Sequence, residues 1–150
     1  DAAEPHAVGT LARITEWDMP EFGVLLLSTL GGERFRIIER RTLPNQLVEA
    51  RIERLPADAK ADAGEALQLC ANVLRVVIED LLEQARDEGV DGFISPFPEP
   101  HRLDDAGWVA NRWAEMLPIS LEQKQELLEM PDAAARLHRV EQYLRENGVI

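Results

Sequence analysis

The sequence has few of the residues that support several common kinds of site. A single cysteine, Cys70, excludes an internal disulfide and leaves no basis for a cysteine-rich zinc site. Basic residues are also scarce: 16 Lys and Arg stand against 28 Asp and Glu, so the formal net charge is −12. Affinity for nucleic acids and for anionic membranes comes largely from Lys and Arg, so this balance argues against both partners.

Long apolar runs are missing as well, and aromatic residues are few. The longest apolar run, residues 24–27, is far too short to span a bilayer. The first residues are polar and show no signal peptide, so a cytoplasmic protein is expected. Aromatic residues make up only 5% of the chain, so Leu, Val, Ile and Ala must form the core. The length of 150 residues fits one domain or two small packed lobes.

The character of the chain changes near Pro56. Residues 1–56 carry seven basic and nine acidic side chains, whereas residues 57–150 carry nine basic and nineteen acidic ones. Hydrophobic patterns typical of strands come before this point, and patterns typical of helices come after it. This order predicts an α+β chain with a β lobe at residues 1–56 and a helical bundle lobe at residues 57–150.

Four strands are predicted in the first lobe. They cover residues 9–17, 22–30, 33–41 and 47–55. Residues 18–21 supply the first turn, and Gly31-Gly32 is a two-residue hairpin signal for the second. The apolar run at residues 24–27 predicts a strand that is buried on both faces.

Four helices are predicted in the second lobe. They run from residue 62 or 63 to about 88, from 105 to 117, from about 120 to 129, and from Pro131 to about 147. Asp104 is the expected N-cap of the second helix, and Ser120 with Gln123 forms a capping box for the third. The expected buried side chains are Cys70 on the first helix; Val109, Trp113 and Met116 on the second; and Ala135, Leu137, Val140 and Leu144 on the last.

No combination of residues in the sequence points to catalysis. The Walker and G-x-S-x-G signatures are absent, and neither Lys60 nor Lys124 follows a glycine-rich loop. Ser120 and Lys124 have the spacing of a Ser–Lys dyad, but a helix-capping role accounts for Ser120 better. The histidines lie in three different segments and lack ligand spacing: His6, His101 and His138. We therefore expect no enzyme activity, no cofactor and no metal.

Two groups of residues are instead candidates for a peptide-binding surface. Arg34, Arg36 and Arg40 are expected on one strand face, which is either a solvated face or a docking surface for acidic or polar peptide groups. Apolar residues at predicted turns and loops form the second group: Trp17, Met19, Phe22, Phe93 and Phe97. Exposed aromatic side chains at such positions can hold hydrophobic segments, although packing between the lobes is the more ordinary explanation.

Four motifs in order along the chain resemble the Lon N-terminal, or substrate-binding, domain. V-G-T-L-A-R-I at residues 8–14 and G-E-R-F-R-I at residues 32–37 resemble two strands of that family. L-D-D-A-G-W-V-A-N-R-W-A-E-M-L-P at residues 103–118 is similar to stand-alone, Lon-like bacterial proteins without ATPase and peptidase domains. Q-E-L-L-E at residues 125–129, followed by A-R-L at 135–137, resembles a helix pair of the family.

The resemblance implies both a fold and a function. The family fold is a PUA-like β pseudo-barrel followed by a helical bundle, here of about four helices. The family domain helps an ATP-dependent protease to recognise substrates, which implies a non-catalytic module that binds unfolded or tagged polypeptides in protein quality control. The PUA-like topology suggests an RNA-binding domain as the alternative, and the net charge of −12 weighs against it.

The family also has N-terminal strands that this chain does not match. The pseudo-barrel is therefore expected to be incomplete on its N-terminal side, leaving the strand at residues 24–27 without a cover. Strands upstream of this sequence are the preferred cover for residues 24–27, because the family that the motifs resemble has strands there. Self-association of two copies across the open strand edge is the other expected arrangement.

Overall fold

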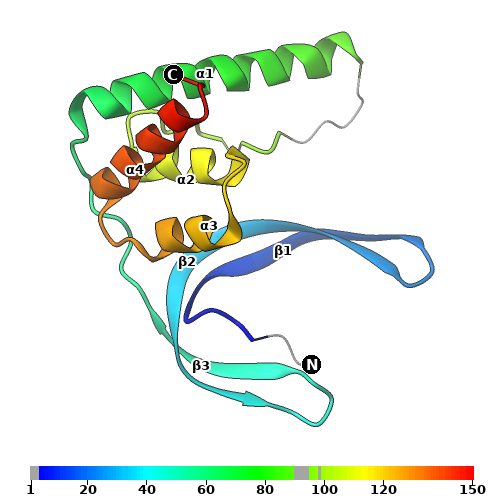
Figure 1. Ribbon diagram of the computed structural model, residues 1–150. Helices are drawn as coiled ribbons and strands as arrows, with labels where there is room; N and C mark the ends of the chain where they lie inside the picture. Colours follow the sequence, from blue (N-terminus) through cyan, green and yellow to red (C-terminus); the bar gives the residue numbers. More distant parts are fainter. Residues whose placement is uncertain (1–3, 90–94, 98) are drawn as a thin grey trace. The chain divides into compact units, whose positions relative to one another are not determined.

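The computed structural model describes residues 4–89, 95–97 and 99–150 (Figure 1). The chain separates after Ala57 into two compact units, residues 1–57 and residues 58–150, here called the β unit and the helical unit. In the described residues, the β unit contains three strands in one antiparallel sheet, and the helical unit contains four helices. The predicted α+β class is confirmed.

The sheet of the β unit is built from two overlapping hairpins. Its strands are β1 (Val8–Glu21), β2 (Val24–Thr42) and β3 (Val48–Arg54), in the order β1-β2-β3. β1 pairs with the first half of β2, and β3 pairs with the second half. The first turn consists of Phe22 and Gly23, and Gly23 has a φ of +88°, which suits glycine. The turn therefore follows the predicted segment 18–21 rather than lying within it.

β2 is one strand of 19 residues, so the predicted hairpin at Gly31-Gly32 is wrong. Neither glycine has a positive φ, which tight hairpin turns of this kind require. The two glycines instead allow β1 and β2 to approach closely at an irregularity in their register. A Cβ atom on Gly32 would lie 3.3 Å from the carbonyl oxygen of Leu11. The glycine pair thus serves strand pairing rather than chain reversal.

The helical unit contains the four predicted helices with small shifts at their ends. They are α1 (Gly64–Asp87), α2 (Ala106–Met116), α3 (Leu121–Glu129) and α4 (Ala133–Glu146). The capping box of Ser120 and Gln123 at the start of α3 is confirmed. Asp105, rather than Asp104, caps α2 by accepting a hydrogen bond from the backbone of Trp108. Asp132 caps α4, so Pro131 precedes the helix instead of beginning it.

The helical unit has its own hydrophobic core. α2 packs against α1, α3 and α4, and the indole N–H of Trp113 donates to the carbonyl oxygen of Cys70 at 3.0 Å. Two residues expected in this core are exposed. Met116 is 37% exposed because the neighbouring Leu117 takes the buried position at the end of α2. Ala135 is exposed because a residue two places before the buried Leu137 lies on the opposite side of a helix.

Candidate functional site

The β1–β2 hairpin, comprising residues 8–36, exposes large apolar side chains. Each residue from Val24 to Leu27 is between 44% and 54% exposed, so the predicted burial on both faces is not present in this chain. The described part of the β unit is a single sheet layer, and one layer cannot cover both of its own faces. Trp17 is 69% exposed, and Phe22 at the turn is fully exposed. Contiguous exposed apolar side chains of this kind make the hairpin a candidate interaction surface.

One face of this hairpin is lined by apolar side chains. Trp17 on β1 is directly opposite Leu27 on β2, and directly opposed residues of paired strands share a face. Leu25 shares that face because side chains two positions apart on a strand point the same way. Ile14 is opposite Thr29 on the same side. We call Ile14, Trp17, Leu25 and Leu27 the apolar face of the hairpin.

The other face of the hairpin carries three carboxylates beside apolar side chains. The register places Asp18 opposite Leu26 and Glu21 opposite Val24, and Glu16 lies two residues before Asp18 on the same side. A β-bulge between Asp18 and Glu21 returns Glu21 to this face. We call Glu16, Asp18, Glu21, Val24 and Leu26 the acidic face of the hairpin. All five residues are exposed.

Charge divides the β unit into two parts. Residues 14–33 contain four acidic residues and no basic ones, whereas residues 34–54 contain six basic and three acidic residues. The part of the hairpin around its turn, residues 14–33, is therefore acidic, and the second half of the sheet is basic. The basic residues were predicted from the sequence as a candidate surface, whereas the acidic ones were not.

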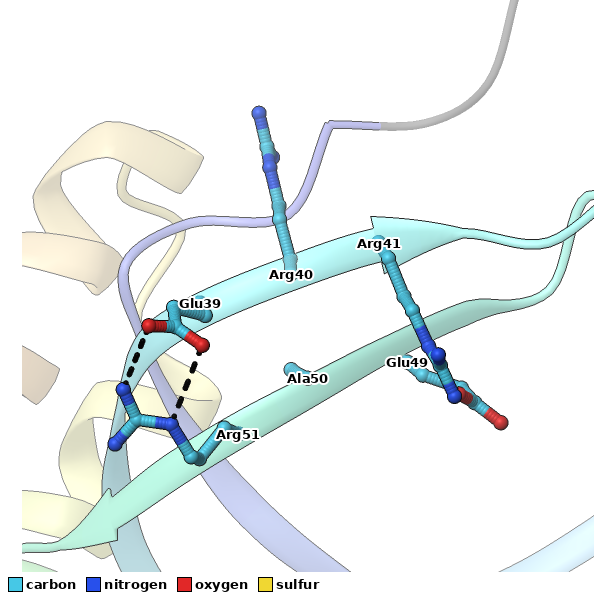
Figure 2. A pocket seen from close by; sticks show the side chains of 6 residues that line it. All are labelled: Glu39, Arg40, Arg41, Glu49, Ala50 and Arg51. Atoms are coloured by element: carbon cyan, nitrogen blue, oxygen red, sulfur yellow. Dashed lines mark hydrogen bonds and ion pairs between the residues drawn. The ribbon is translucent and has the colours of Figure 1, made fainter.

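The three arginines predicted to share one face do not do so. Ile38 is an extra residue between two consecutive pairs of β2 with β3, and this bulge reverses the alternation of side chains beyond it. Arg34 and Arg36 precede the bulge, and Arg40 follows it on the opposite face. Figure 2 shows Arg40 and Arg41 pointing to opposite sides of the strand pair. A bulge of this kind leaves no clear signal in one sequence.

The basic part of the sheet is lined by ion pairs. An open depression there is bordered by charged side chains of β2 and β3 (Figure 2). The pairs are Arg41–Glu49 (2.6 Å), Arg51–Glu39 (2.9 Å), Arg54–Glu33 (2.7 Å) and Arg40–Glu4. Exposed pairs of this type add little stability. These four arginines are already matched by carboxylates, so a docking acidic group would have to displace them.

The remaining sequence candidates fall in different places. Met19 is 51% exposed near the turn of the hairpin, beside Trp17 and Phe22. Phe97 is only 4% exposed and belongs to the helical core, with its backbone N–H donating to the Ser95 hydroxyl at 3.1 Å. It is therefore inaccessible to a peptide. Phe93 lies outside the described residues.

The residues considered for catalysis have structural partners. The Ser120 hydroxyl accepts a hydrogen bond from the backbone of Gln123, and the Lys124 ammonium donates to the carbonyl oxygen of Glu115 at 3.1 Å. Cys70 is fully buried, and burial, with a smaller contribution from Glu141, raises its pKa to about 11. It is therefore a poor nucleophile.

Within the described ranges, no cluster of three or more His, Cys, Asp or Glu could hold a metal ion, and no helix is long and apolar enough to cross a membrane.

Comparisons with known proteins agree on one family. The family model described as the ATP-dependent protease La (LON) substrate-binding domain matches residues 1–146. A crystal structure of a Lon N-terminal domain protein from Xanthomonas campestris is 31% identical, with a TM-score of 0.66 over 91% of this chain and 67% of that chain. The N-terminal domain of a Mycobacterium avium complex Lon protease shares the fold at 20% identity, with a TM-score of 0.61 over 93% of this chain and 70% of that one. No curated protein matches the chain.

Proposed function

Because the chain belongs to the family of the Lon protease substrate-binding domain, we propose that it is a non-catalytic module that binds unfolded or tagged polypeptides. The observation that supports this most strongly is the exposed apolar surface of the β1–β2 hairpin. Unfolded polypeptides differ from folded ones in exposing apolar side chains, so they are the partners that such a surface fits. A role in protein quality control and a cytoplasmic location are part of the proposal.

The apolar face of the hairpin would supply most of the binding free energy. Fully burying a large apolar side chain is worth about 1.5–3 kcal/mol. Trp17, Leu25 and Leu27 are each about half exposed or more, so a partner that covers them gains about 1 kcal/mol from each. The side chains of Met19 and Phe22 extend this surface to the turn.

The arginines named from the sequence would have a smaller role. Arg34 and Arg36 lie before the bulge and can flank a bound segment, whereas Arg40 is on the opposite face and paired with Glu4. A polypeptide that contacts one face therefore meets at most two of the three. The proposal places affinity on the apolar face of the hairpin and leaves these arginines at its margin.

The test is the affinity of the full chain for fluorescein-labelled unfolded casein, measured by fluorescence anisotropy. The double variant Trp17→Ser/Leu27→Ser should bind at least about tenfold more weakly, which corresponds to about 1.4 kcal/mol. The matched control is Leu121→Ser, because Leu121 is 77% exposed but lies on α3. Its affinity should equal that of the parent chain.

Two results would contradict the proposal. Equal casein affinity of the double variant and the parent would remove the hairpin as the binding surface. Salt-dependent binding of a labelled RNA, without binding of casein, would support the RNA-binding alternative instead. Circular dichroism of the double variant should match the parent, since both replaced side chains are exposed.

A further inference from the structure

The acidic face of the hairpin has a two-row arrangement. Glu16, Asp18 and Glu21 form a row of carboxylates along β1, and Val24 and Leu26 form an apolar row along β2. Neighbouring strands lie about 4.8 Å apart, so the two rows are side by side within reach of one bound segment. Val24 is 44% exposed and Leu26 is 54% exposed, so both rows are open to a partner.

The carboxylates of this face lack basic partners. No basic residue occurs between Arg13 and Arg34 in the sequence. Arg13 itself is opposite Leu30, so it lies on this face at the end of the row that is farther from the turn. Among the residues that the structure describes, none of the three forms an ion pair, and Asp18 only accepts a hydrogen bond from the backbone of Met19 at 2.7 Å. Three other carboxylates of the β unit are different, because Glu33, Glu39 and Glu49 pair with arginines.

On the basis of the proposed function, we infer that the acidic face selects polypeptide segments in which Lys or Arg residues flank apolar ones. Basic side chains would meet the carboxylate row, and the adjacent apolar side chains would meet Val24 and Leu26. Acidic segments and RNA would be repelled by the same row. The two faces are opposite sides of the same strand pair, so one segment of an unfolded chain covers the apolar face while another, basic segment of that chain passes to the acidic face.

Exposed charges of this kind contribute more to selection than to total affinity. Complementary charges speed association and disfavour partners of the wrong sign. Their effect is screened by salt, since the Debye length falls from about 10 Å at 0.1 M to about 3 Å at 1 M. A preference that comes from the acidic face must therefore weaken as salt is raised, whereas binding by the apolar face must not.

The experiment uses two fluorescein-labelled peptides of 20 residues with identical apolar residues. One carries five lysines between the apolar residues, and the other carries five glutamines in their place. Anisotropy titrations with the full chain at 50 mM NaCl should give about tenfold tighter binding of the lysine peptide. At 1 M NaCl the two affinities should agree within about twofold.

Two triple variants show whether the acidic face is responsible. Glu16→Gln/Asp18→Asn/Glu21→Gln should remove the preference for lysine while leaving the affinity for the glutamine peptide unchanged. Glu79→Gln/Asp80→Asn/Glu83→Gln changes the net charge equally on an exposed part of α1 and should keep the preference.

The inference is overturned if the hairpin variant keeps its preference for lysine, or if the α1 variant loses as much of it. The second result would assign the preference to the net charge of −12 rather than to a surface. Failure of the proposed function gives a different result, because neither peptide would then depend on Trp17 and Leu27. The two ideas can therefore fail separately.

Discussion

The two units differ in how far their apolar side chains are buried. In the helical unit, Leu74, Val109 and Leu137 are completely buried. In the β unit, Trp17 and Leu25 are more than half exposed although both lie in paired strands. Apolar residues of the helical unit therefore stabilise its fold, whereas those of the hairpin remain available to a partner. The contrast assigns stability mainly to the helical unit, and the proposed binding surface lies on the β unit.

Charged residues show the same contrast. Arg136 is 1% exposed in the helical unit, and its guanidinium donates to both carboxylate oxygens of Asp58, at 2.6 and 3.1 Å. It also donates to the carbonyl oxygen of Leu127 at 3.0 Å and to the side chain of Asn111 at 3.2 Å. The ion pairs of the β unit are exposed to solvent instead. Only the buried pair should matter for stability.

The largest effect is expected from removing the buried guanidinium. Arg136→Met removes the guanidinium that donates to Asp58 and to several carbonyl groups, so the free energy of unfolding should fall by about 3–5 kcal/mol. Urea unfolding followed by circular dichroism measures it. Arg75→Met on α1 is the control, because Arg75 is exposed, and it should stay within about 0.5 kcal/mol. A loss below 1 kcal/mol in Arg136→Met would contradict the buried role.

Trp113 should be the next most sensitive position. Trp113→Ala removes a buried ring and the donor to the Cys70 carbonyl, and should cost about 3–5 kcal/mol in urea unfolding. Met116→Ala on the same helix should cost less than about 1 kcal/mol, because Met116 is 37% exposed. Similar losses in the two variants would mean that the core of α2 extends to its last turn.

A matched pair of leucines compares the two units directly. Leu74→Ala in the helical core should lower the free energy of unfolding by about 2–5 kcal/mol. Leu27→Ala in the hairpin should lower it by less than about 1 kcal/mol, because Leu27 is 48% exposed. Both are measured by urea unfolding at one protein concentration. A large loss in Leu27→Ala would show that the apolar face of the hairpin is buried in solution.

The smallest effect concerns pH. A hydrogen bond from Arg145 lowers the pKa of Glu141, with Arg145 Nη2 and Glu141 Oε1 2.7 Å apart. A carboxyl whose folded pKa is depressed stabilises the fold above its unfolded pKa of about 4.3, and this is lost as the pH falls through the folded value. Glu141→Gln should therefore lose about 0.3–0.5 kcal/mol at pH 7 and progressively less in acid. A difference that stays constant down to pH 2.5 would contradict this.

Local signals in the sequence predicted most of the helical unit. The capping box at Ser120 depends on residues three positions apart, and the helices follow from periodicity, so both could be derived without tertiary information. The pair of Asp58 and Arg136 could not, because 78 positions separate them. Phe97 was predicted to be a surface residue because it lies in a loop. The loop sequence does not reveal that the Phe97 side chain is buried in the helical core.

The β unit was harder to predict because its side-chain directions depend on strand register. The bulge at Ile38 moved Arg40 to the opposite face, and another bulge returned Glu21 to the face of Asp18. Neither follows from strict alternation. For Trp17 and Phe22 the sequence left two alternatives open, a binding surface or packing between the lobes, and both side chains are exposed.

The central claim is that polypeptides bind to the β1–β2 hairpin and not to the helical unit. Hydrogen exchange of the full chain, with and without saturating unfolded casein, tests it most directly, because amides covered or stabilised by a partner exchange more slowly. The account predicts slower exchange within residues 14–30 and unchanged exchange in α1 and α4. Protection confined to the helical unit, or no protection anywhere at saturation, would contradict it.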